Sequence, residues 1–273
     1  MDKLYIGIDA GSRATKLVAV DAAGKGVHYA TVDQSVRPAD TARELFDAAC
    51  ARTRRTATVA RCVATGYARN LLTFADRAIT EITCHAKGCL ALYPAAEAVI
   101  EIGGQDSKFI RLRQGRVHDF VMNDRCAAGT GRFLEVVAVR LGLSLTALHQ
   151  EGTQAPAPQP HETETPCAPV TISSMCVVFA ETEVIGLLAA GTPPMVIMRG
   201  VQRAIATRVA AMTGNRNQLH GDIIFTGGVA QVRGMSDALT HVLNRPLLIP
   251  GRPQYTGALG AALIARDECM RGV

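Results

Sequence analysis

The feature that most constrains the fold of this chain is an internal repeat, offset by 92 residues between positions 9 and 101. Each copy has a strand-like segment, a glycine turn and a second strand-like segment: YIGID, AGSRAT and KLVAVD, then AVIEI, GGQDS and KFIRL. Aligned without gaps, residues 9–16 lie over residues 101–108, with an acid, a glycine, a hydroxyl and a lysine in register. Chance similarity between two glycine-rich turns is the alternative, but the matching flanks favour duplication. Two such hairpins, each followed by a third strand and helical sequence, predict an α/β protein with two similar lobes.

The order of segments gives the expected lobe boundaries. We expect lobe I to cover residues 1–95, completed by a C-terminal helix over residues 256–270, and lobe II to cover residues 96–255. The expected helices include residues 40–54, residues 194–213 and one after each of Cys126 and Cys176, and the expected strands include RCVATGY, GDIIFTGGVA and RPLLIP. The segment TQAPAPQPHETETPCAPV is rich in Pro, Thr and Glu, which predicts a surface loop and makes Cys167 a poor ligand.

Composition excludes several classes of protein. No run of eighteen apolar residues is present and the N-terminus lacks the pattern of a signal peptide, which predicts a soluble, cytoplasmic protein that does not bind a membrane. The net charge of +5 comes from scattered residues and the chain has no tryptophan, which argues against a nucleic-acid surface. Eight cysteines in a cytosolic chain are unsuited to disulfides, so we expect core thiols and one or two ligands.

The first glycine turn has the parts of a phosphate-binding hairpin. Backbone N–H groups freed by Gly11, with the hydroxyls of Ser12 and Thr15, can hold phosphate oxygens. Asp9, at the strand end, can hold a hydrated Mg²⁺. Many hairpins carry Gly and Ser in their turns, so the prediction depends on the second copy.

The second and third glycine turns complete a predicted ATP site. Gly103, Gly104 and Ser107 repeat the phosphate-binding pattern. Gln105 or Asp106 is placed to orient an attacking water, and Glu101 completes the expected catalytic set. Gly227 and Gly228, in FTGGVA, form a third turn at a strand end where adenosine can lie against the backbone.

The three turns resemble the phosphate-1, phosphate-2 and adenosine motifs of the actin, sugar kinase and Hsp70 superfamily. That resemblance implies an actin-like ATPase fold with two ribonuclease-H-like lobes and a nucleotide cleft between them. More narrowly, GIDAGSRATK, ITCHAKG, EIGGQDSK, NDRCAAGTGRFLE, SSMCVVFAETEVI and FTGGVA resemble the BadF/BadG/BcrA/BcrD ATPase family. This family contains activators of 2-hydroxyacyl-CoA dehydratases and ATPase subunits of benzoyl-CoA reductase. The resemblance runs from about residue 4 to residue 265 and leaves out only the Pro-rich loop.

The resemblance implies that Cys126 and Cys176 are iron ligands. Independently, both cysteines stand just before an amphipathic helix, with Asn123 and Asp124, or Ser173 and Ser174, as candidate N-caps. Helix N-termini favour thiolates and anionic clusters. Two thiolates are half of the set that a [4Fe-4S] cluster needs, so we expect a dimer that shares one cluster.

The remaining candidates surround these motifs. In MNDRCAAGTGRF, we expect Gly129, Thr130 and Gly131 on the nucleotide side and Cys126 on a two-fold axis. Glu135 either accepts from a ribose hydroxyl or lies on a solvated helix face. His85 or Lys87 touches nucleotide or a lobe interface, or simply belongs to a helix start with buried thiols. Lys16 and Lys108 reach phosphate or, as is commoner, are surface lysines.

Three functions from different classes remain open at this point. The first is an ATPase that takes an electron from ferredoxin or flavodoxin and passes it to a dehydratase or reductase component that binds acyl-CoA. Its dimer partner is a second copy or a homologous ATPase subunit. The second is a small-molecule kinase, for example of an amino sugar, and the third is a nucleotide-gated regulator or chaperone-like module.

Overall fold

The computed structural model describes residues 2–53, 57–144, 169–173, 176–214 and 219–272. Residues 153–168 of the Pro-rich segment, with Cys167, lie outside these ranges, as does Ser174. The chain divides into two compact units. Unit 1 contains Met1–Val99, Ile110–Asp119 and Gln254–Val273, and unit 2 contains Ile100–Phe109 and Phe120–Pro253. This division passes within strands of the second sheet.

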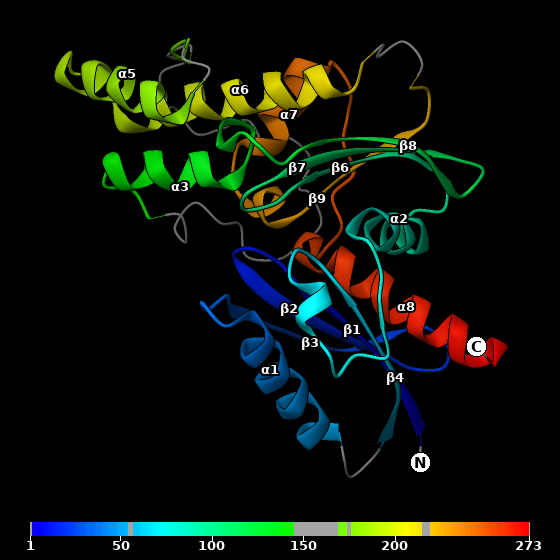
Figure 1. Ribbon diagram of the computed structural model, residues 1–273. Coiled ribbons are helices and arrows are strands. Elements are labelled where there is room, and N and C mark those ends of the chain that lie inside the picture. Colours follow the sequence, from blue (N-terminus) through cyan, green and yellow to red (C-terminus); the bar gives the residue numbers. More distant parts are fainter. Residues whose placement is uncertain (1, 54–56, 145–168, 174–175, 215–218, 273) are drawn as a thin grey trace. The chain divides into compact units, whose positions relative to one another are not determined.

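Unit 1 is built on a mixed five-stranded sheet of order β3-β2-β1-β4-β5 (Figure 1). The strands are β1 (Asp2–Ala10), β2 (Ala14–Val20), β3 (Gly26–Asp33), β4 (Ala57–Thr65) and β5 (Arg77–Ala78). The first three form an antiparallel meander, and β4 runs parallel to β1. The first glycine turn therefore joins β1 to β2 at the edge where β1 ends.

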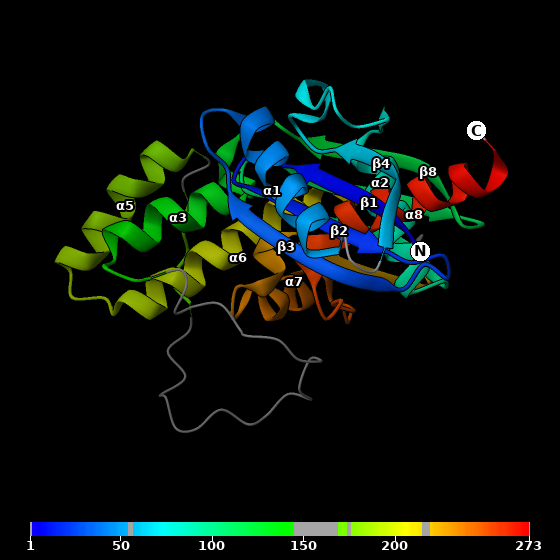
Figure 2. The ribbon, with the colours of Figure 1, turned by 90° about the horizontal axis from the view of Figure 1, so that it is seen from below.

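Helices cover both faces of this sheet, so residues 4–10 of β1 and most of β2 are buried. The helices are α1 (Pro38–Thr53), η1 (Arg69–Leu71), α2 (Glu81–Leu92), η5 (Pro253–Tyr255) and α8 (Thr256–Arg271). Successive side chains of a strand point to opposite faces: Val18 packs with α8, whereas Leu17 packs with residues of α1. Figures 1 and 2 show α1 and α8 on opposite faces of the sheet.

Glycines allow α8 to pack closely on α2 and β1. A Cβ at Gly260 would lie 1.8 Å from the carbonyl oxygen of Cys84, and one at Gly7 would lie 2.1 Å from that of Ala258. Neither backbone position tolerates a side chain without displacement of the helix. The C-terminal helix thus packs on β1, β2, β4 and α2 of unit 1.

The second sheet has four strands in the order β8-β7-β6-β9. They are β6 (Ala96–Ile102), β7 (Ser107–Arg113), β8 (Arg116–Asn123) and β9 (Asp222–Thr226). Four residues join β6 to β7, which requires an antiparallel hairpin because a parallel pair needs a longer crossover. The duplicated hairpin predicted from sequence is therefore present, and the α/β class with two mixed sheets is confirmed.

Unit 2 adds the helices that follow the two cysteines. These are η2 (Ala127–Gly129), α3 (Gly131–Arg140), α5 (Val177–Ala189), α6 (Pro194–Met212), η4 (Gly228–Gln231) and α7 (Met235–Leu243). The long helix α6 contacts α3, α5 and α7. The amphipathic helix predicted after Cys126 is present as α3, with Phe133, Leu134 and Val137 buried.

Two further observations complete the comparison with the sequence. The predicted strand RPLLIP is wrong: only Leu248 forms a β-bridge, to Ile224. Its neighbours Pro246 and Pro250 lack the N–H groups that a longer ladder needs. Within the described ranges, no helix is both long and apolar enough to cross a membrane.

Candidate functional site

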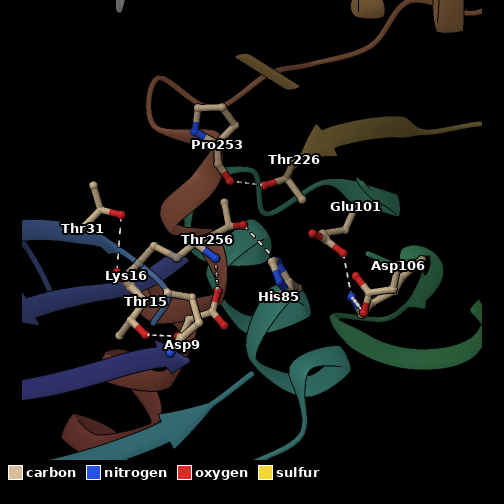
Figure 3. A network of polar contacts seen from close by, with 12 residues as sticks. Asp9, Thr15, Lys16, Thr31, His85, Glu101, Asp106, Thr226, Pro253 and Thr256 are labelled. Carbon is tan, nitrogen blue, oxygen red and sulfur yellow. Dashed lines mark hydrogen bonds and ion pairs between the residues drawn. The ribbon is translucent and has the colours of Figure 1, made fainter. Parts of the chain in front are cut away.

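Each hairpin contains its own ion pair, and the two pairs are formed by equivalent residues of the repeat (Figure 3). In the first, Lys16 Nζ lies 3.3 Å from Asp9 Oδ2, and Asp9 and Lys16 are cross-strand partners. In the second, Lys108 Nζ lies 2.8 Å from Glu101 Oε2. The repeat is therefore preserved at the level of side-chain contacts. The first and second glycine turns are thus each closed at the base by a carboxylate and a lysine.

In the first turn, the backbone and Ser12 are more accessible to a ligand than Thr15. Thr15 is fully buried, and its Oγ1 donates to Gln34 Oε1 at 2.6 Å. Gly11 N–H donates to Ala14 O at 3.2 Å, whereas Ser12 is half-buried. Thr15 thus stabilises the hairpin from inside.

His85 and Thr256 lie beside the Asp9 carboxylate. His85 is buried, with Nδ1 3.0 Å from Thr256 Oγ1. A Cβ at Gly257 would lie 3.0 Å from His85 Nε2 and 3.2 Å from Asp9 Oδ2. The start of α8 therefore reaches the end of β1, and Thr256 and Gly257 are site residues that sequence reasoning missed.

Lys87 has a structural partner in unit 1. Its Nζ lies 2.7 Å from Asp267 Oδ2, which ties α2 to α8. Burial by itself would raise the pKa of Asp267, but hydrogen bonds and charge from Lys87 and Arg266 outweigh burial and lower that pKa. The buried thiols Cys84 and Cys89 on α2 agree with a helix start that packs in the core.

The second turn contains a buried cation. Lys108 Nζ contacts both Glu101 Oε2 and Asp106 Oδ2 at 2.8 Å, and its side chain is 2% exposed. The expectation of a surface lysine at this position is wrong, because both faces of β7 are covered here. Ser107 is also fully buried, and its Oγ donates to Met212 Sδ at 3.7 Å. Gln105, in contrast, is exposed at the tip of the turn.

The third turn packs directly against the second. Gly227 has φ +93°, and a Cβ there would lie 2.4 Å from Ile102 O and 2.7 Å from Glu101 Oε1. Its N–H donates to Pro253 O, which also accepts from Thr226 Oγ1 at 2.6 Å. Gly228 is exposed, with open space where a side chain would stand. The structure therefore brings the Glu101 carboxylate to two of the predicted glycine turns.

The loop after β8 is hydrogen-bonded to the second turn. Gly131 N–H donates to Gly103 O at 2.9 Å, and Arg132 N–H donates to Gly104 O at 2.8 Å. Gly129, Thr130 and Gly131 are all buried. The close approach made by Gly131 is to the backbone of the second turn, since a Cβ would lie 3.0 Å from Gly103 O.

Helix α3 starts later than expected, because the sequence predicted a helix directly after Cys126. Its N-cap is Thr130, whose side chain accepts from Arg132 N–H, so α3 begins five residues after Cys126. Asn123 does not cap α3; it accepts from Cys126 N–H at 3.2 Å and donates to Cys126 O at 2.9 Å. Asp124 is exposed. Glu135, one turn into α3, pairs with Arg132 at 3.1 Å.

The two candidate ligand cysteines differ from the core thiols. Cys126 is half-buried at the N-cap of η2, and Arg208 Nη1 donates to its Sγ at 3.8 Å. Cys176 is exposed at the N-cap of α5, where no side chain caps the helix. Ser173, expected as a cap, instead donates its N–H to Glu183 at 3.0 Å. Cys84, by comparison, is buried, which raises its pKa to about 12.

Cys126 and Cys176 offer two of the four thiolates that a [4Fe-4S] cluster needs. Among the described residues, no group of three or more His, Cys, Asp or Glu side chains is placed to hold a metal ion. Cys176 is exposed at the start of α5, and the half-buried Cys126 lies beside a guanidinium; both surroundings suit a ligand of an anionic iron-sulfur cluster that is completed by a second chain.

Comparisons with known proteins agree with this arrangement. The BadF/BadG/BcrA/BcrD ATPase family matches residues 6–265. The chain is 40% identical over 271 residues to the activator of lactoyl-CoA dehydratase from Anaerotignum propionicum, covering 97% of this chain and 98% of that one. It is 30% identical over 268 residues to a subunit of benzoyl-CoA reductase from Thauera aromatica, covering 94% of this chain and 91% of that one.

A solved structure extends the likeness to the fold. The activator of 2-hydroxyisocaproyl-CoA dehydratase from Clostridium difficile, with bound ADPNP, is similar with a TM-score of 0.85 and 33% identity. The alignment covers 98% of this chain and 96% of that one. The predicted actin-like ATPase fold is thereby confirmed.

Proposed function

Because the chain belongs to the BadF/BadG/BcrA/BcrD ATPase family, we propose that it hydrolyses ATP to drive low-potential electron transfer to a CoA-thioester dehydratase or reductase. Its full-length similarity to a dehydratase activator supports this activity. One structural observation carries the proposal. The loop that contains Cys126 leads into α3, whose first N–H groups donate to the carbonyls of the second glycine turn. A nucleotide turn and a candidate cluster ligand therefore belong to one hydrogen-bonded segment.

In the proposed ATP site, each turn has a distinct role. Gly11, Ser12 and the N–H groups of the first turn bind phosphate, and Asp9 holds Mg²⁺ through water, while Thr15 supports the hairpin. The N–H groups of Gly103 and Gly104 bind phosphate in the second turn, which the buried Ser107 supports. Gly227 and Gly228 lie against adenosine, and Glu135 accepts from the ribose.

Exposure and pairing support the proposed catalytic residues. Gln105 is the exposed side chain of the second turn, and Asp106 is held by Lys108 at 2.8 Å. Either can orient the attacking water, since both stand at the turn that binds phosphate. Glu101 acts through Lys108 as a positioning residue, because its carboxylate is buried and paired.

Cys126 and Cys176 supply the protein's two thiolates to a [4Fe-4S] cluster, and a second copy or a homologous subunit supplies the other two. The bound cluster provides a one-electron carrier. The start of α5, beside Cys176, contributes ~1 kcal/mol to anion binding. In a one-electron couple, ~59 mV corresponds to ~1.4 kcal/mol, so several hundred millivolts need on the order of 10 kcal/mol. ATP is the proposed source, and the hydrogen bonds from Gly131 and Arg132 to the second turn transmit its effect.

The partners follow from the same proposal. The electron donor is ferredoxin or flavodoxin, the acceptor is a dehydratase or reductase component that binds the acyl-CoA, and all of them work in the cytoplasm. A sugar kinase needs an aspartate base and a sugar pocket, and it has no use for accessible cysteines at two helix starts.

Cysteine variants test the separation of the two sites. Prepared without oxygen, Cys126→Ser and Cys176→Ser should each lose iron but bind MgATP with unchanged affinity. Cys269→Ser is the matched control, because Cys269 is a half-buried thiol on α8 with no proposed role; it should keep its iron. Retention of iron in both ligand variants, or joint loss of iron and nucleotide binding, would overturn the proposal.

A further inference from the structure

We propose that Arg208 is a positioning residue that holds the Cys126 sulfur and raises the reduction potential of the cluster bound there. This inference rests on the proposed function for the cluster itself. The contact with Cys126, however, is a feature of the chain and can be tested without iron.

The Arg208 side chain reaches Cys126 from α6. Arg208 is half-buried, and its Nη1 lies 3.8 Å from Cys126 Sγ, within hydrogen-bond distance for sulfur. Gly129 lies between Asn123 and Arg208: a Cβ there would lie 3.0 Å from Asn123 Nδ2, a tight contact, and 3.6 Å from Arg208 Cδ, an ordinary van der Waals distance. The loop is therefore shaped to pass between an amide and a guanidinium.

Asn123 and Arg208 hold different parts of Cys126. Asn123 binds both the N–H and the carbonyl of Cys126, at 3.2 and 2.9 Å, and so fixes the backbone. Arg208 is the partner of the sulfur atom. One helical turn further along α6, Met212 accepts from Ser107 of the second hairpin. The same face of α6 thus contacts the sulfur and the nucleotide-binding hairpin.

The chemistry of the guanidinium sets the sign of the effect. Arginine is always charged in proteins and donates N–H groups in a rigid fork. A cationic donor beside a ligand sulfur stabilises the reduced cluster more than the oxidised one, because reduction adds one negative charge. Removal of Arg208 should therefore make the cluster harder to reduce.

Reduction potentials of matched variants test the charge effect. In Arg208→Gln we expect the equilibrium constant for reduction to fall about tenfold, which is ~59 mV for one electron. Arg208→Lys keeps the charge and should stay within about twofold of wild type, or ~18 mV. Arg203→Gln removes the same charge from an exposed position of α6 and should leave the potential unchanged. Thermal melting checks that each variant is folded.

A second measurement needs no cluster. In apoprotein at constant pH, we would compare the rates at which Cys126 reacts with an anionic disulfide, dithiobis(nitrobenzoate), and a cationic one, cystamine, by mass spectrometry of the labelled peptide. The rate with the anionic reagent divided by the rate with the cationic reagent reports the charge near the thiol. The ionised fraction of the thiol cancels in this ratio because it affects both rates equally. We expect this ratio to fall about fivefold in Arg208→Gln and to stay constant in Arg203→Gln.

The outcomes separate the two proposals. A lower rate ratio together with a lower potential supports the inference. An unchanged ratio in Arg208→Gln overturns it, whether or not iron is bound, and so does an unchanged potential in a folded, iron-loaded variant. Iron-free wild-type protein would instead contradict the proposed function.

Discussion

Loss of the buried cation Lys108 should destabilise the second hairpin far more than loss of its counterpart destabilises the first. Lys108 Nζ contacts two carboxylates at 2.8 Å, and its side chain is 2% exposed. With an effective dielectric constant of about 20, each contact has a gross Coulomb energy of ~6 kcal/mol, most of which desolvation offsets. Removal of one partner of such a pair leaves uncompensated buried charge and costs ~3–5 kcal/mol.

Lys16 is the matched control because it occupies the equivalent position of the repeat. Its Nζ lies 3.3 Å from one carboxylate, and its side chain is 18% exposed. Loss of Lys16 from this partly hydrated pair should lower the free energy of unfolding by ~1 kcal/mol.

Hydrogen exchange of the two hairpins measures both losses locally. Lys108→Met should lower the opening free energy of β6 and β7 amides by ~3–5 kcal/mol, and Lys16→Met should lower that of β1 and β2 by ~1 kcal/mol. The double variant Glu101→Gln with Lys108→Met should recover part of the loss, since one carboxylate is neutralised as well. A loss in Lys108→Met no larger than in Lys16→Met would refute the reasoning.

Three further predictions concern packing, ionisation and thiol access. Gly131→Ala should destabilise the protein by ~1–3 kcal/mol and weaken ATP binding, because the added Cβ would press on Gly103 O. Gly186→Ala is the control on α5, where an added Cβ meets no atom within 4 Å, and it should stabilise the protein by ~0.5–1 kcal/mol. Shifts of the melting temperature in the same direction for both variants would contradict this prediction. Lys87 and Arg266 lower the pKa of Asp267 against the effect of burial. Wild type should therefore be more stable than Asp267→Asn above pH ~4, and this difference should disappear as the pH falls through the lowered pKa. A difference between the urea unfolding midpoints of the two proteins that persists in acid would refute the prediction. In iron-free protein, Cys84, with its pKa raised to about 12 by burial, should resist iodoacetamide at neutral pH until the protein unfolds, whereas the exposed Cys176 should react at once. Equal rates for the two thiols in the folded, iron-free protein would contradict the assignment.

Much of the fold could be predicted because its signals are local. The two hairpins follow from alternating apolar segments around glycine turns, and the expected helix over residues 194–213 closely matches α6, Pro194–Met212. The same duplication implied a carboxylate and a lysine at each turn base, and the structure pairs them.

The site details that sequence missed depend on contacts between distant residues. His85 and Thr256 are separated by 171 positions, and no local pattern joins them. The burial of Lys108 follows from coverage of β7 on both faces, although the acids at positions 101 and 106 were a signal that it could be paired. The true start of α3 carried a signal in Thr130, a favourable N-cap residue directly before Gly131, but Cys126 drew the expected helix start toward itself.

Native mass spectrometry of wild-type protein, purified without oxygen, can show whether two chains hold one [4Fe-4S] cluster. We expect a dimer whose mass exceeds that of its two chains by about four iron and four sulfide atoms. Dimers or monomers that hydrolyse ATP but carry no iron would contradict it.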